Sequence, residues 1–138
     1  MNVVLDASAA LAWIFERQAP EEVAQADQLL DNLETQSAWV PALWHIEVAN
    51  ALLVAERRGV VTEAQISVYL TRLSQLPIET DATPSAARQE AVMLLARRMN
   101  LSAYDATYLD LALRADAWLA TFDQKLAAAA RGLGLSSF

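Results

Sequence analysis

The chain has 138 residues, of which 55% are hydrophobic, and a formal net charge of −7. This length and composition predict a single domain over residues 1–138 with one hydrophobic core. The absence of cysteine excludes disulfides and thiolate metal sites, and no segment approaches the ~20 apolar residues of a membrane span, so we expect a cytoplasmic protein without membrane contact. The acidic charge opposes nonspecific binding to nucleic acid, unless several acids hold cations that attract phosphate.

Two short strands, each followed by helical segments, are predicted in the first half of the chain. Residues 3–5 form a β-branched and aliphatic run that is too short for a helix and suits a strand buried on both faces. Good helix formers fill residues 7–15, and Pro20 opens a second helical segment. Residues 38–40 predict another strand, and residues 42–58 predict a long helix.

The second half of the chain continues this alternation of helices and short strands. Helix starts are marked by the capping pair Thr62 and Gln65, by Thr83 with the first-turn proline Pro84, and by Ser102. Helices are expected at 62–76, 84–99, 102–114 and 122–131, and strands at 77–80, 117–120 and, in the tail, 135–138. Short apolar strands separated by helices indicate parallel crossover connections. The predicted fold class is therefore α/β, a three-layer α/β/α sandwich with a central, mainly parallel sheet.

Two acidic residues follow predicted strands. Asp6 comes directly after the strand at 3–5, and Asp123 follows the strand at 117–120 through Thr121. Because open parallel sheets bind ligands at the carboxyl ends of their strands, both acids are candidate site residues. Each is also a good helix N-cap, and Ser8 would either bond a backbone amide or support the Asp6 carboxylate.

Glu47 is the acid whose position is hardest to explain by capping. On a helical wheel it falls beside Leu43, Asn50 and Val54, on an apolar stripe. A carboxylate that faces inward requires a metal, a cation or hydrogen-bond donors. The alternative is a side chain that bends out to solvent or pairs with arginine. Asn50, one turn further on, is either a partner of Glu47 or a core amide.

The helix that begins near Ser102 carries a third candidate. Asp105 fits a capping box with Ser102, but its wheel position groups it with Tyr108 on the side expected to pack on the sheet. Asp110 lies away from that face, and we expect it to be solvated. His45 is turned away from Glu47 on its own helix and is expected to be a structural or interface residue.

A parallel sheet would bring Asp6, Glu47, Asp105 and Asp123 to one edge. Carboxylates packed together raise one another's pKa unless a cation is bound between them. All-oxygen ligands favour magnesium or manganese, whereas a chain with one histidine and no cysteine is poorly suited to tetrahedral zinc. We therefore expect these acids to form a Mg²⁺ or Mn²⁺ site. The alternative is a noncatalytic acidic binding module whose carboxylates only cap helices.

The segments that carry these acids resemble the PIN-domain family, and specifically the VapC toxins. In family order they are residues 3–10 (VVLDASAA), 41–52 (PALWHIEVANAL), 101–109 (LSAYDATYL) and 119–126 (LATFDQKL). The resemblance spans essentially the whole chain. It implies a PIN-like fold and a Mg²⁺- or Mn²⁺-dependent endoribonuclease, the toxin component of a VapBC-type toxin–antitoxin pair, in which a metal-activated water hydrolyses RNA phosphodiester bonds.

The same resemblance implies a role for each site residue. Asp6 and Asp105 would ligate the metal directly, Glu47 and Asp123 would complete the pocket directly or through water, and the supporting residues would be Ser8 and Thr121. The family also implies a homodimer and a VapB-like antitoxin that blocks the site. A PIN nuclease with a non-toxin role in RNA or DNA processing is the alternative.

The second apolar face of the 42–58 helix and the paired arginines each have two interpretations. The face of the 42–58 helix opposite Glu47 is apolar and would pack either against a second subunit or inside the chain; it consists of Trp44, Val48, Leu52 and Ala55. Two pairs of arginines would either favour helix C-termini or contact a phosphate backbone; they are Arg57 with Arg58 and Arg97 with Arg98.

Overall fold

Four short parallel strands form the centre of the structure, a computed structural model that describes residues 2–138. They are β1 (Val3–Leu5), β2 (Ala38–Val40), β3 (Ile78–Thr80) and β4 (Trp118–Ala120), and their order across the sheet is β3-β2-β1-β4. All pairings are parallel, so helices connect each strand to the next. The C-terminal tail adds only one parallel bridge, between Ser137 and Leu119, where the sequence predicted a further strand.

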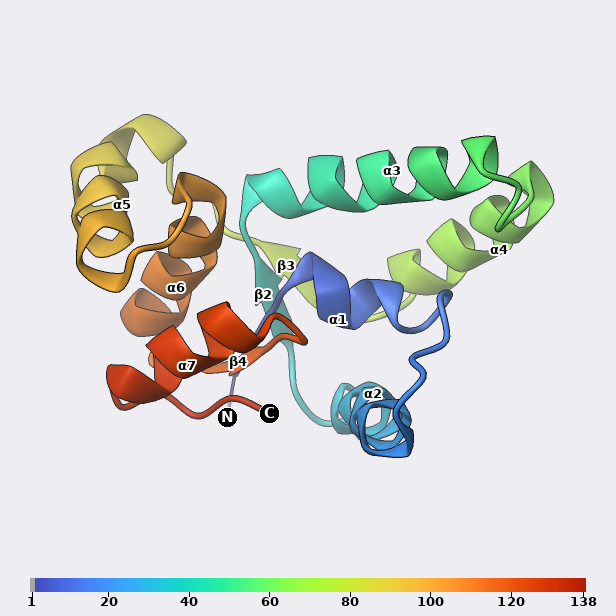
Figure 1. Cartoon of the computed structure of the whole chain (residues 1–138), viewed down its shortest axis with the longest axis horizontal. Coiled ribbons are helices and arrows are strands. Elements are labelled where there is room, and N and C mark those ends of the chain that lie inside the picture. The colour runs from blue at the N-terminus through green and yellow to red at the C-terminus, as the bar shows by residue number, and fades with distance from the viewer. Residues whose placement is uncertain (1) are drawn as a thin grey trace.

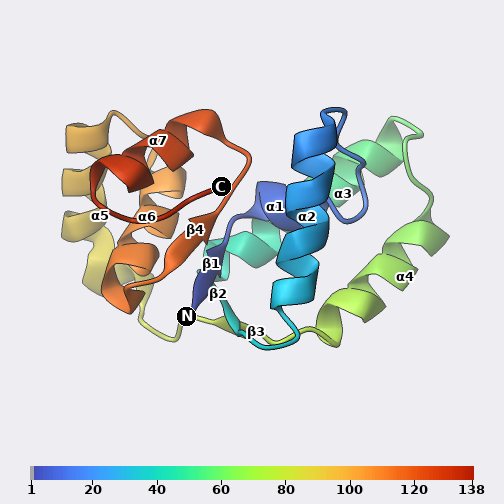
Figure 2. The same cartoon turned by 90° about the horizontal axis from the view of Figure 1, so that it is seen from below.

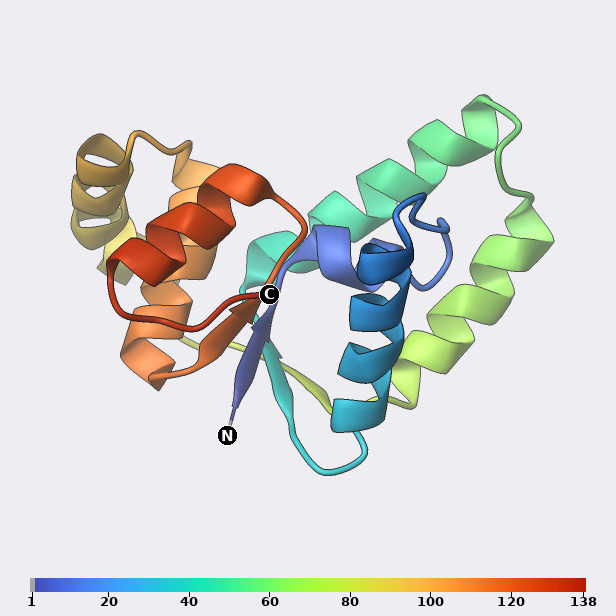
Figure 3. The same ribbon diagram turned by 60° about the horizontal axis from the view of Figure 1, so that its bottom comes forward.

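Helices lie on both sides of this sheet (Figures 1, 2 and 3). They are α1 (Ala7–Leu11), α2 (Pro20–Asn32), α3 (Ala42–Arg57), α4 (Glu63–Ser74), α5 (Ser85–Met99), α6 (Ala103–Ala115) and α7 (Gln124–Gly132). Figures 2 and 3 show α5, α6 and α7 on one side and α1, α2 and α4 on the other, which confirms the predicted α/β/α arrangement. Within residues 2–138, no helix combines the length and apolar composition needed to cross a membrane.

Helix α1 is shorter than predicted because the chain turns towards α2. It ends at Leu11, and in the turns that follow, the Trp13 indole N–H donates a hydrogen bond of 3.0 Å to the Ala26 carbonyl. On the other side of α1, the Tyr69 hydroxyl of α4 donates a 2.5 Å bond to the Ala10 carbonyl. These two bonds fix the helix that begins directly after Asp6.

The apolar face of α3 packs inside the chain, so the interpretation that it meets a second subunit is wrong. Its buried residues are Trp44, Val48, Leu52 and Ala55. By contrast, Ile46 is 70% exposed and Asn50 is also exposed. The side of α3 that carries Glu47 is therefore the border between the core and solvent.

The two predicted helix caps in the middle of the chain have different outcomes. The capping box at Thr62 and Gln65 is confirmed, with bonds of 3.2 Å from the Gln65 amide to the Thr62 hydroxyl and 2.9 Å from the Thr62 amide to the Gln65 side chain. The cap at Thr83 is wrong, because Pro84 occupies the N-cap position of α5. Thr83 lies outside the helix, where its hydroxyl is 3.4 Å from Nη1 of Arg114.

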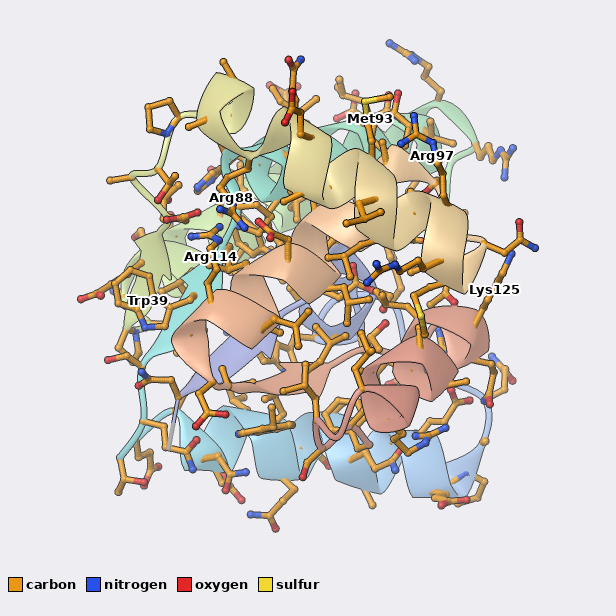
Figure 4. All side chains as sticks on the ribbon, turned by 90° about the vertical axis from the view of Figure 1, so that its left-hand side faces the viewer. Trp39, Arg88, Met93, Arg97, Arg114 and Lys125 are labelled. Atoms are coloured by element: carbon orange, nitrogen blue, oxygen red, sulfur yellow. The ribbon has the colours of Figure 1, made fainter. Side chains whose placement is uncertain are left out.

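The prediction that Asp110 is solvated is also wrong. Asp110 is only 4% exposed, and its carboxylate lies 2.7 Å from Nη2 of Arg88 and 3.1 Å from Nε of Arg114. Figure 4 shows the two arginines side by side. Arg114 also pairs with Asp81 at 2.8 Å. Burial alone would raise the pKa of Asp110, but hydrogen bonds from the two arginines outweigh it and lower that pKa. This network joins α5 and α6 to the loop after β3.

Candidate acidic site at the sheet edge

The register of the two central strands brings opposite ends of the chain together at the carboxyl edge of the sheet. Leu5 of β1 pairs with Ala120 of β4, and the Asp6 amide donates a 3.0 Å hydrogen bond to the Ala120 carbonyl. The next residues, Asp6 and Thr121, therefore lie side by side. This register is what brings the two strand ends of the expected site to the same edge of the sheet.

Asp6 is held by two hydroxyl groups and does not cap its helix. Its Oδ2 atom accepts hydrogen bonds of 2.6 Å from Ser8 and 2.7 Å from Thr121, whereas it forms no side-chain cap bond to α1. The residue is 7% exposed. Both hydroxyls bond the same oxygen, so neither occupies Oδ1. The structure thus brings Ser8 and Thr121 into contact with Asp6, as expected for supporting residues.

The same two hydroxyls bind the loop between β4 and α7. Ser8 Oγ accepts a 3.0 Å hydrogen bond from the Phe122 amide, and Thr121 Oγ1 accepts a 3.0 Å bond from the Asp123 amide. Because each hydroxyl accepts from a backbone N–H and donates to Asp6, the carboxylate and the loop are fixed relative to each other.

Glu47 has a partner that the sequence did not reveal. The buried Tyr108 of α6, with no exposed surface, donates a 2.5 Å hydrogen bond to Glu47 Oε1 across the gap between α6 and α3. Asn50 is not this partner: it is exposed and lines a different cavity. One signal was available, since Tyr108 lies one helical turn after Asp105, on the face predicted to pack on the sheet.

Helix capping accounts for Asp123 but only in part for Asp105. Asp123 Oδ1 accepts a 3.0 Å bond from the Leu126 amide, so this side chain caps α7. At α6, Ser102 Oγ accepts a 3.1 Å bond from the Asp105 amide, but among residues 2–138 no return bond runs from the Ser102 amide to the Asp105 carboxylate. The half-buried Asp105 carboxylate is therefore available for another role.

The acids lie within range of one another's charge. Burial raises the pKa of Asp6, and the charge of Asp123 adds to the rise. Burial, followed by the charges of Asp6 and Asp105, raises the pKa of Glu47, although its hydrogen bond from tyrosine opposes the change. Burial and the charges of Asp123 and Asp6 likewise raise the pKa of Asp105. The structure thus brings the predicted acids together as one electrostatic unit.

These acids suit a hard divalent cation in their chemistry. Among the described residues, no group of three or more acidic or histidine side chains is arranged so that it could hold a metal ion as it stands. The donors are nevertheless all carboxylate oxygens, which Mg²⁺ and Mn²⁺ prefer, and a cation between them would offset both the burial and the mutual repulsion that raise their pKa. His45 is directed elsewhere, with Nε2 2.8 Å from the Thr80 hydroxyl.

A large cavity of about 1390 Å³ lies apart from this acidic site. It is enclosed by the turns after α1 and by α3 and α4, and its lining includes Trp13, Val54, Val68 and Leu76. None of the four candidate acids lines it. Its lining is largely apolar, and we call this cavity the apolar groove.

A parallel α/β/α domain with acids gathered at the carboxyl edge of its sheet defines the class of this protein. The family model described as PIN domain matches residues 3–132, and the chain belongs to the PIN-domain family. A similar solved structure is PAE2754 from Pyrobaculum aerophilum, 27% identical with a TM-score of 0.70, covering 99% of this chain and 83% of that chain. FitAcB from Neisseria gonorrhoeae has the same fold at 19% identity, with a TM-score of 0.62, covering 100% of this chain and 96% of that one. A search of the curated proteins finds no match.

Proposed function

We propose that the protein is a Mg²⁺- or Mn²⁺-dependent endoribonuclease. The observation that carries this proposal is the Asp6 carboxylate, buried at the sheet edge and fixed by two hydroxyls, within charge range of three other acids. A buried carboxylate surrounded by like charges destabilises the fold, and such an arrangement is typical of a site kept for function. Membership of the PIN-domain family supports the assignment to nucleases.

In this proposal the acids divide into ligands and supporting groups. Asp6 and Asp105 would hold the cation directly, with Glu47 and Asp123 acting directly or through water. Bound there, Mg²⁺ or Mn²⁺ would supply a Lewis acid for a phosphate oxygen and lower the pKa of a water molecule. The Ser8 and Thr121 hydroxyls keep Asp6 in one orientation. No side chain here resembles an activated nucleophile, so we expect direct hydrolysis to a 5′-phosphate and a 3′-hydroxyl.

The test pairs cleavage with metal binding. We expect millimolar Mn²⁺ to support cleavage of structured RNA by the wild type and to raise its melting temperature, and we expect Asp6→Asn and Asp105→Asn to lose both effects. Asp27→Asn, an exposed acid on α2, is the matched control and should behave as the wild type. An unchanged melting temperature together with intact RNA would favour a noncatalytic acidic module.

We further propose that the nuclease is the toxin of a VapBC-type pair. The support is the resemblance of its acidic segments to VapC toxins. Expression of the wild type alone in a bacterial host should arrest growth and degrade RNA, whereas expression of Asp6→Asn should not. Normal growth with cleavage in vitro would instead indicate a non-toxin processing nuclease.

The apolar groove is the surface we assign to one segment of the VapB-like antitoxin; because the groove lies apart from the acids, a second segment would block the acidic site. Val68 is 52% exposed within its lining, so a partner's amphipathic helix would cover apolar surface that is now in water. Val68→Asp should weaken the complex with a co-expressed antitoxin and leave RNA cleavage unchanged. If the complex with Val68→Asp is as stable as the wild-type complex, the antitoxin binds elsewhere.

A homodimer is the remaining part of the proposal. With the apolar face of α3 used in the core, the surface left for it includes Ile46 and Tyr104, which are 70% and 64% exposed. Light scattering after size-exclusion chromatography should give twice the mass of the chain, and Ile46→Asp should shift it towards the monomer.

A further inference from the structure

Most positively charged side chains of the chain share one location, the C-terminal end of a helix. Most of its ten basic residues lie at the C-terminal ends of helices, where the helix dipole favours a cation. Those in a last turn are Arg57, Arg72, Arg97, Arg98, Arg114 and Arg131, and Arg58 is the C-cap of α3. The helix C-terminus interpretation of the two arginine pairs is therefore confirmed, and their positions need no ligand to explain them.

Three basic residues lie elsewhere, and two of them have acidic partners. Arg17 is 2.7 Å from Glu22, and Arg88 is 2.7 Å from the buried Asp110. The third is Lys125, the only lysine of the chain. It is exposed, and in the part of the chain that the structure describes it forms neither a salt bridge nor a side-chain hydrogen bond.

Lys125 occupies a position that the helix does not favour. It is the second residue of α7, directly after the Asp123 cap and Gln124, where the positive end of the helix dipole repels a cation. Figure 4 shows its side chain extending from α7 on the side of α5. Lys125 lies two residues after Asp123, the acid that caps α7, and is therefore in the first turn of the helix that begins at the acidic site. The ammonium group therefore lies at the rim of the acidic site. At this position it does not stabilise its own helix.

We infer that Lys125 is a substrate-binding residue whose ammonium group binds a nonbridging oxygen of the RNA backbone beside the acidic site. The inference rests on the proposed nuclease function. A phosphate that approaches clustered carboxylates is repelled, and a flexible, unpaired ammonium at the rim offers it a point of attachment. Because the net charge is −7, the rest of the surface attracts RNA only weakly. A single cation beside the site would therefore contribute a large part of the affinity for RNA.

The first test measures binding without cleavage. Fluorescence anisotropy would follow a single-stranded RNA on Asp6→Asn, with and without Lys125→Met, over a range of salt concentrations. Loss of one phosphate contact should weaken binding about fivefold or more and lower the slope of log K against log salt by about 0.7. Lys125→Arg keeps the charge and should keep the slope. Arg57→Met removes an equal charge from the far end of α3 and is the matched control, with little effect expected.

The second test uses the fact that the chain has a single lysine. An amine-reactive reagent gives one side-chain product, at Lys125, which mass spectrometry separates from the N-terminal product. RNA should slow labelling of Lys125 several-fold in Asp6→Asn. If the RNA binds but neither the salt slope with Lys125→Met nor the labelling rate changes, the Lys125 assignment is wrong and the nuclease proposal stands. If the wild type neither binds nor cleaves RNA, both are wrong.

Discussion

Asp6 receives both of its hydroxyl hydrogen bonds on the same carboxylate oxygen. The bonds fix the plane of the carboxylate and also lower its pKa, against the larger rise that burial causes. Ser8 and Thr121 therefore act on both the orientation and the charge of Asp6. Groups that orient a metal ligand in this way typically contribute about 10- to 100-fold to metal affinity or activity.

Thr121→Val tests this role with little change in side-chain volume. Loss of the hydroxyl removes a bond that lowers the pKa of Asp6, so ionisation of Asp6 should require a higher pH. Cleavage should fall about tenfold near neutral pH, and the acidic limb of the pH–rate profile should move to higher pH. Thr71→Val on the exposed side of α4 is the control. An unshifted profile would show that the hydroxyl does not tune Asp6.

Tyr108 orients Glu47, as Ser8 and Thr121 orient Asp6. Tyr108→Phe keeps the buried ring and removes only the 2.5 Å hydrogen bond to the carboxylate. We expect a folded protein whose activity and Mn²⁺ affinity fall about tenfold, since Glu47 is then free to turn to solvent. Activity assays and calorimetric Mn²⁺ titration would measure the effect. Equal Mn²⁺ affinity in both proteins would assign Tyr108 to the core alone.

At the level of elements, α5 has no fully buried residue and packs mainly against α6. Beside the partly buried Leu95 and Met99, the ion pair of Arg88 with Asp110 is the charged contact that links α5 to α6. An arrangement that depends on a buried charge is sensitive to loss of either partner.

Asp110→Asn should lower the free energy of unfolding by about 2 kcal/mol, because it leaves two arginines without their carboxylate. Urea unfolding would measure the loss, with Asp27→Asn as the exposed control. The pKa of Asp110 is lowered in the fold, so its contribution is present above the ordinary aspartate pKa and disappears as the pH falls through the folded value. Equal stability of the two variants would contradict this role.

Elements with strong local signals were predictable, and contacts between distant elements were not. Short apolar strands and parallel crossovers follow from the order of apolar runs and helical segments along the chain, and so does the position of Asp6 at a strand end. Helix α3 is apolar on two sides, so a wheel could not identify its core face, and Asn50 was assigned to the wrong environment. The bond from Tyr108 to Glu47 joins residues 61 apart, and that from Arg88 to Asp110 joins residues 22 apart. No local pattern encodes either pairing.

For the whole molecule, the acidic site lowers stability in the absence of a cation. Asp105 has a raised pKa in the fold, so its ionised form is disfavoured there relative to the unfolded chain. This penalty is complete above the folded pKa and vanishes below the ordinary aspartate pKa of about 3.9.

Asp105→Asn should therefore melt at a higher temperature than the wild type at neutral pH in the presence of EDTA. The difference should shrink as the pH falls towards about 4. Calorimetry over this pH range would measure it, and added Mg²⁺ should raise the melting temperature of the wild type more than that of the variant. A difference that is constant with pH would mean that ionisation of the half-buried Asp105 is not its cause.

The pairing of β1 with β4 also determines when the acidic site can assemble during synthesis of the chain. Asp6 and Thr121 are 115 residues apart in the chain, and the bond between them closes one of the longest loops in the fold. A ribosome synthesises β1 early, but Asp6 has neither Thr121 nor the loop of Asp123 until residues 118–123 have emerged and paired. A nascent chain thus carries no assembled acidic site until the last strand of the sheet is in place.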